Sequence, residues 1–208
     1  MIITLIDYGL GNVTSVQRAF ERLGITVKRT ASPDDIISAE AVAVPGVGAF
    51  RKAMENLEER ALAEPLRSYL FEGRPYLGIC LGLQMLFTQS LEHGITQGLG
   101  IFRGSVERIT GNVKVPHMGW NRVYPKGQGE EMFSGIKDGA YFYFDHSYRV
   151  MSEDDVAASL TEYGTEFVSA VRAGNIWGVQ FHPEKSDSCG LRLLENFARS
   201  AGEGRDAG

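Results

Sequence analysis

A cysteine between two glycines is the residue of this sequence best suited to nucleophilic chemistry. Cys80 lies in Gly78-Ile79-Cys80-Leu81-Gly82, between an apolar run that predicts a strand and an amphipathic run through Phe87 that predicts a helix. In such an elbow the sharp turn lifts the nucleophile above the sheet, and the helix amino terminus favours a thiolate. The alternative is a small buried hydrophobic residue, the commonest role of a free cysteine. Cys189, which has no strand before it, is interpreted in that second way.

A thiol nucleophile needs a base, and the chain has four histidines. His182 follows the apolar run 176–181, so we expect it at the carboxyl end of a strand, where α/β sites assemble. Pro183 interrupts strand pairing there, and Glu184 can turn back to hold the imidazole by a hydrogen bond. Alone, this motif would be read as a capped surface histidine beside a solvated glutamate; together with the elbow it predicts a triad of Cys80, His182 and Glu184. The other histidines are less suitable bases, in the order His146, then His93 and His117.

A glycine loop at the end of an earlier predicted strand suggests an oxyanion site. In Pro45-Gly46-Val47-Gly48 the glycines let a backbone N–H of Val47 or Gly48 approach a tetrahedral intermediate without side-chain collision. The N–H of Leu81, directly after the nucleophile, would be the second donor. Many strand ends need such turns, so the loop gains meaning from its position before the elbow.

The elements that would position these residues alternate in the first half of the chain. Short β-branched runs followed by amphipathic helices predict parallel strands with crossover helices. Strands are expected at about 2–6, 25–29, 41–44 and 75–79, and helices after Asn12, after Ser32, and at about 50–58 and 62–71. From Gly98 the pattern predicts a mixed or antiparallel region with strands at 101–109, 113–115, 141–150, 156–160, 167–172 and 176–181, then a helix near 190–201.

The composition is that of one globular domain. The chain has 208 residues, 43% of them hydrophobic and 23% charged, with a net charge of -5, so nucleic acid and anionic membranes are not expected partners. No apolar run approaches the roughly 20 residues that span a bilayer. Only two cysteines are present, which excludes a disulfide scaffold and favours the cytoplasm. We expect residues 1–201 to form the domain and 202–208 a frayed tail.

The motifs resemble the class I glutamine amidotransferases: Gly78-Ile79-Cys80-Leu81-Gly82-Leu83-Gln84 together with Phe181-His182-Pro183-Glu184. The resemblance implies the flavodoxin-like α/β fold of that family, with a mostly parallel sheet flanked by helices and an additional antiparallel region in the C-terminal half. It also implies that the cysteine attacks the side-chain amide of L-glutamine, releasing ammonia and then glutamate, without a cofactor or metal. By position, the residues that resemble the family's substrate-binding groups are Gly46, Gln84, Glu92, Ser147 and Tyr148. For Glu92 a solvated helix charge is the alternative.

Four further stretches resemble the glutaminase subunits of imidazole glycerol phosphate synthase, an enzyme of histidine biosynthesis. They are Asp7-Tyr8-Gly9-Leu10-Gly11-Asn12, Pro45 to Phe50, Pro116-His117-Met118-Gly119-Trp120-Asn121 and His146-Ser147-Tyr148. This implies a (β/α)₈ barrel cyclase as partner, which uses the ammonia to form imidazole glycerol phosphate and an aminoimidazole carboxamide ribotide. The resemblance places Met118, Trp120, Asn121 and Asn12 at the interface; for Trp120 the alternative is a core tryptophan.

One position departs from the family, which usually has an aliphatic residue where this chain has Asp145. A carboxylate there could raise the pKa of His146 or bind a cation.

Other functions remain open at this point. A glutaminase of another synthase, such as anthranilate synthase or the pyridoxal phosphate complex, would lack the Asp-Tyr-Gly and His-Met-Gly-Trp stretches. A cysteine hydrolase or chaperone with a related elbow would lack Phe-His-Pro-Glu and Gln84. A regulatory module that has kept the fold without turnover would not need all three triad residues.

Overall fold

The computed structural model of the chain describes residues 1–203. Its N-terminal half alternates strands and helices, as the sequence predicts. The strands are β1 (Ile2–Ile6), β2 (Thr26–Thr30), β3 (Ala41–Gly46) and β4 (Tyr76–Cys80), and the helices are α1 (Val13–Arg22), α2 (Pro33–Ile37), α3 (Phe50–Glu59) and α4 (Ala63–Phe71). The helices form where apolar residues recur at helical spacing: α1 buries Val13, Val16, Ala19 and Phe20 on one face. Asn12 precedes this helix, but its side chain makes no capping hydrogen bond.

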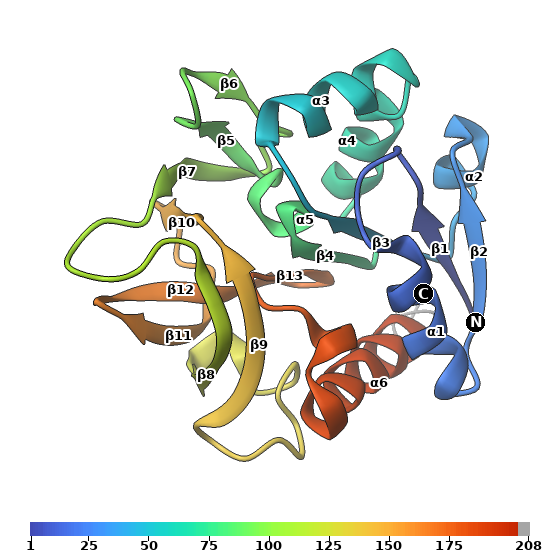
Figure 1. The fold of residues 1–208 in the computed structure, drawn as a ribbon. Helices are drawn as coiled ribbons and strands as arrows, with labels where there is room; N and C mark the ends of the chain where they lie inside the picture. The colour runs from blue at the N-terminus through green and yellow to red at the C-terminus, as the bar shows by residue number, and fades with distance from the viewer. Residues whose placement is uncertain (204–208) are drawn as a thin grey trace.

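A parallel sheet with the order β2-β1-β3-β4-β13 forms the centre of the molecule, where β13 is Ile176–Val179. Helices α1 and α6 (Asp187–Glu203) bury their apolar sides against one face of this sheet, and α2, α3 and α4 cover the other (Figure 1). This is the doubly wound arrangement in which sites form at the carboxyl ends of the strands. The predicted mostly parallel sheet flanked by helices is confirmed.

The sheet continues from β13 into the C-terminal half with mostly antiparallel pairs. In order across the sheet these strands are β12 (Thr165–Ala173), β10 (Tyr148–Ser152), β7 (Phe102–Arg108), β5 (Phe87–Ser90) and β6 (Thr96–Gln97), with β7 and β5 parallel. Strand β11 (Ala157–Tyr163) pairs with β12 and β8 (His117–Pro125), and β8 pairs with β9 (Ala140–His146). Short 3₁₀ turns occur at Gly127–Gly129 and Pro183–Lys185.

Several sequence predictions about these elements are wrong. The helix after Cys80 is the single turn α5 (Leu81–Gln84) and does not continue to Phe87, because Phe87 begins strand β5 beside β7. The predicted strand 141–150 is interrupted at Ser147, and 113–115 is not a strand. Helix α6 begins at Asp187 and includes residues 202 and 203, which were assigned to the frayed tail; the rest of that tail, 204–208, lies outside the described residues.

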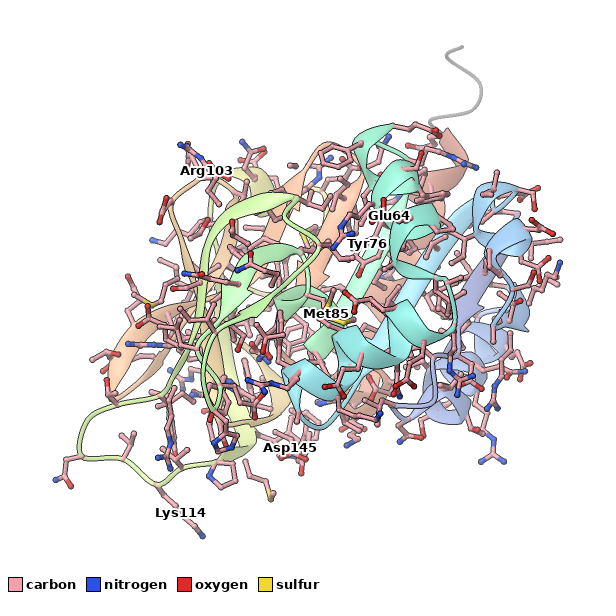
Figure 2. The ribbon with its side chains drawn as sticks, turned by 90° about the horizontal axis from the view of Figure 1, so that it is seen from above. Glu64, Tyr76, Met85, Arg103, Lys114 and Asp145 are labelled. Carbon is pink, nitrogen blue, oxygen red and sulfur yellow. The ribbon has the colours of Figure 1, made fainter. Side chains whose placement is uncertain are left out.

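The antiparallel region projects beside the central sheet. Seen from above, Lys114 is at the tip of the loop between β7 and β8 and points away from the body of the protein, whereas Met85 lies inside it (Figure 2). Within residues 1–203 no helix has the length and apolar character needed to cross a membrane.

Candidate active site

Cys80 is the last residue of β4, and its backbone has the geometry of the predicted elbow. Its φ is 54° and its ψ is −105°, a conformation that is strained for a residue with a side chain. The flanking glycines are required by close packing: a Cβ at Gly78 would overlap the backbone at Gly82, and one at Gly82 would overlap the carbonyl oxygen of Val44. The register pairs Cys80 with Gly46 on β3, so the thiol and the glycine loop share the carboxyl edge of the sheet.

His182 and Glu184 reach the same edge from the turn that follows β13. Nδ1 of His182 lies 2.9 Å from Oε1 of Glu184, and both side chains are almost completely buried. Burial lowers the pKa of His182, but the thiol of Cys80 and the carboxylate of Glu184 more than offset this and raise it to about 10. Nε2 of His182 is buried and has no hydrogen-bond partner within the described part of the chain. The imidazole is therefore held at one nitrogen and free at the other.

The thiol of Cys80 has two polar neighbours that the sequence did not indicate. Its Sγ lies 3.9 Å from the carbonyl oxygen of Asp145, and Nε2 of Gln180 donates to Sγ at 3.5 Å. Gln180 is completely buried. Its signal was a polar residue within the apolar run 176–181, two positions before His182.

A cavity of about 290 Å³ opens beside Cys80. Its lining includes most of the predicted oxyanion and substrate residues: Val47, Gly48, Leu81, Gln84, Glu92, Ser147 and Tyr148. Gly46 is not among the lining residues. A Cβ there would overlap the Tyr8 hydroxyl and crowd Leu81, so packing requires a glycine at this position. Gly48 has a φ of +103° and open space where a Cβ would stand, as expected for a loop whose backbone faces a ligand.

Two polar side chains in this cavity are held by the protein itself. Gln84 donates from Nε2 to the carbonyl oxygen of Tyr148 at 3.1 Å and to Oε1 of Gln180 at 3.0 Å. Glu92 lies in a turn after β5 rather than on a helix, and its Oε2 accepts the backbone N–H of Phe50 at 2.7 Å. Both residues line the cavity, and the amide nitrogen of Gln84 is already engaged within the protein.

His146 lines the cavity as well, but both of its ring nitrogens are occupied. Nδ1 lies 2.7 Å from the carbonyl oxygen of Tyr148, and Nε2 lies 2.8 Å from Nδ1 of His117. The expectation that Asp145 could raise the pKa of His146 is wrong: burial dominates and lowers that pKa to about 3. Adjacent residues of a strand point to opposite faces, so the Asp145 carboxylate faces away from the imidazole.

Strand alternation also separates the predicted interface residues. Met118 and Trp120 are exposed on the outer face of β8, where Trp120 packs edge-on against Tyr143. The side chain of Asn121 belongs to the inner face and lies 3.2 Å from Nε2 of His117. Asn12 is exposed at the start of α1. Within residues 1–203 no group of three or more His, Cys, Asp or Glu side chains is arranged to hold a metal.

Comparison with known proteins adds a family and close relatives. The family model "Glutamine amidotransferase class-I" matches residues 4–201. The "Imidazole glycerol phosphate synthase subunit HisH" of Moorella thermoacetica is 47% identical over 207 residues, covering 99% of this chain and 98% of the relative. The protein of the same name from Aquifex aeolicus is 48% identical over 200 residues, covering 95% of this chain and 96% of the relative.

A solved structure described as a glutamine amidotransferase has the same fold. The two structures superpose with a TM-score of 0.75 at 20% sequence identity, over 96% of this chain and 98% of the other.

Proposed function

The chain belongs to the class I glutamine amidotransferase family, and we propose that it is the glutaminase subunit of an imidazole glycerol phosphate synthase in histidine biosynthesis. It hydrolyses L-glutamine to L-glutamate and ammonia and passes the ammonia to a second subunit. The full-length identity of 47% to a protein of that name supports the pathway. The match over residues 4–201 supports a single glutamine amidotransferase domain.

One observation carries the chemistry: a buried imidazole, fixed at Nδ1 by Glu184 and free at Nε2, next to a cysteine on a strained elbow. With the thiol proton already held on Nε2 of His182, the thiolate Sγ of Cys80 attacks the amide carbon of glutamine. The raised pKa of His182 keeps that proton available for the leaving group. Collapse of the tetrahedral intermediate breaks the C–N bond and releases ammonia, leaving a thioester on Cys80. Water then hydrolyses the thioester to glutamate and restores the thiol.

The negative charge of the tetrahedral intermediate is stabilised by backbone donors. The N–H of Leu81, at the start of α5, has no partner within its own helix. The second donor is an N–H of the loop at Val47 and Gly48, which lines the cavity. Rotation of a peptide at Gly48 meets little steric resistance, because no atom outside its chain neighbours lies within 4 Å of the place where a Cβ would stand. This freedom supports slow turnover by the isolated chain and faster turnover once a partner sets the loop.

The cavity beside Cys80 suits the amino-acid end of glutamine. Gln84 and Glu92 present acceptor oxygens, which match an ammonium group, and Glu92 adds a negative charge. The backbone at Ser147 and Tyr148 lies at the same cavity and suits the α-carboxylate. A substrate with one ammonium and one carboxylate is thereby favoured over a simple amide.

The second subunit is a (β/α)₈ barrel cyclase that docks on the outer face of β8 and β9. Four exposed apolar or aromatic side chains gather there: Met118, Trp120, Tyr124 and Tyr141. Large aromatic residues of this kind are enriched at protein interfaces. Met118 is opposite Asp145 in the strand register, and Asp145 lines the cavity beside Cys80. Ammonia released in that cavity therefore has a short path to the partner. Both cysteines are free, which fits a cytoplasmic enzyme.

The test is glutamate release from L-glutamine by the wild-type chain and by Cys80→Ser, each with and without a barrel cyclase and the cyclase's nucleotide ligand. Release that requires Cys80 and is stimulated by the cyclase would support nucleophile, reaction and partner together. Cys189→Ser is the matched control, because Cys189 lies on α6 away from the cavity. Release that ignores the cyclase would overturn the pathway, and no release dependent on Cys80 would overturn the glutaminase.

A further inference from the structure

Two buried histidines lie in contact on β8 and β9, and the reaction described above does not use them. His117 and His146 are opposite each other in the strand register, and both are at most 5% exposed. Nδ1 of His117 is 2.8 Å from Nε2 of His146. The His117 ring is stacked between Phe144 and Tyr163, with centroids 4.7 and 3.9 Å away. Buried polar rings held this tightly need a full set of hydrogen bonds.

The hydrogen bonds fix where each proton of the pair must be. The carbonyl oxygen of Tyr148 only accepts, so Nδ1 of His146, 2.7 Å away, carries hydrogen. Burial favours the neutral imidazoles and lowers the pKa of His117 to about 4 and that of His146 to about 3. In a neutral His146 Nε2 is then bare and accepts from Nδ1–H of His117. Nε2 of His117 is bare in turn and accepts from the Asn121 amide at 3.2 Å.

The chain of donors ends at the cavity beside the thiol. The carbonyl oxygen of Tyr148 accepts two hydrogen bonds, one from Nδ1–H of His146 and one from Nε2 of Gln84. The second hydrogen of that Gln84 amide goes to Oε1 of Gln180, whose own amide donates to Sγ of Cys80. With both hydrogens used inside the protein, Gln84 can offer a ligand only its oxygen.

We propose that His117 and His146 are positioning residues for glutamine hydrolysis: both are held as Nδ1–H tautomers, and through the carbonyl of Tyr148 they fix the Gln84 amide with its oxygen toward the substrate. The inference rests on the proposed glutaminase function. Reversal of either imidazole would set two bare nitrogens or two N–H groups against each other. The hydrogen bonds that hold Gln84 therefore form one chain, which begins at Asn121 on β8 and passes through His117, His146 and the carbonyl of Tyr148.

The tautomers are measured directly by two-bond ¹H–¹⁵N correlation spectra of ¹⁵N-histidine-labelled protein at neutral pH. We expect two imidazoles with protonated Nδ1 and bare Nε2, assigned by their loss in His117→Phe and His146→Gln. An Nε2–H form of either residue would overturn the proposal. This result does not depend on any catalytic activity.

The functional arm uses His117→Phe in the complex with a barrel cyclase and its ligand. Phenylalanine keeps the stack between Phe144 and Tyr163 but removes the donor to His146. Losing one such hydrogen bond should raise KM for glutamine by about two- to tenfold, with a much smaller change in kcat. His117→Asn retains an N–H close to the position of Nδ1 and should restore KM in part. Thr161→Val is the matched control, because the Thr161 hydroxyl is buried nearby without a partner in residues 1–203.

An unchanged KM in His117→Phe, or an equal change in Thr161→Val, would overturn the positioning role. Failure of the proposed function is distinguishable, because it would abolish Cys80-dependent glutamate release in the wild-type chain itself.

Discussion

Replacing Glu184 by glutamine removes the negative charge that faces His182 inside the protein. The two groups are 2.9 Å apart, and their side chains are 1% and 2% exposed, so water screens their interaction very little. Glutamine has nearly the same shape and can still accept from Nδ1–H. The change therefore tests the charge and leaves the packing of the turn after β13 in place.

The size of the effect follows from the hydrogen bond. A hydrogen bond to a charged group contributes about 1.5–3 kcal/mol, and about 1.4 kcal/mol corresponds to one pH unit, so the pKa of His182 should fall by about one to two pH units. It should not return to its ordinary value, because the Cys80 thiol, which also raises this pKa, is still present. Since the imidazole then takes the thiol proton of Cys80 less readily and less thiolate is present, kcat/KM should fall by about 10- to 10²-fold.

The assay is an NMR titration of ¹³C-labelled His182 together with glutamate release in the presence of the cyclase. Glu195→Gln is the matched control, because it removes the same charge from a half-exposed ion pair with Arg192 on α6. An unchanged pKa of His182 in Glu184→Gln would refute the argument that the buried carboxylate holds the proton on the imidazole. A lower pKa with full activity would refute its role in catalysis.

Three further predictions concern stability and assembly. On folding, the pKa of His182 rises from 6.5 to about 10, so the stabilisation it gives is complete below pH 6.5 and is lost as the pH rises toward 10; the urea midpoint should fall over that range, and a constant midpoint would contradict this. Gly82→Ala forces a methyl group into a backbone carbonyl of β3 and should lower the free energy of unfolding by about 1–3 kcal/mol, whereas Gly202→Ala, with open space in α6, should not. Trp120→Ala should weaken cyclase binding by about tenfold or more, measured by calorimetry. Phe71→Ala, which removes a more exposed aromatic side chain from α4, should leave the affinity as it is.

The local features of the site follow from the sequence because they depend on neighbours in the chain. Gly-x-Cys-x-Gly after an apolar strand specifies the strained turn, since glycine alone fits where a Cβ would meet backbone. His182 and Glu184 are two residues apart, so one short turn brings carboxylate and imidazole together. The alternation of strands and helices likewise specifies a parallel sheet and places all three residues at one edge.

Other features were decided by contacts between residues that are far apart in the chain. The helix expected to reach Phe87 ends at Gln84, because the backbone at Phe87 pairs with β7 instead. Nothing local indicated that Gln180 would donate to the thiol of Cys80, 100 residues earlier in the chain.

The pairing of β8 with β9, two strands separated in the chain, decided which side chains face the surface and which contact each other inside. It joins His117 to His146 and turns the side chain of Asn121 away from the exposed face that carries Trp120. Sequence pattern tells which residues share one face of a strand, but the neighbour that this face meets depends on register and topology. The proposed triad therefore follows from the sequence itself, whereas its hydrogen-bonded surroundings were determined only by the tertiary structure.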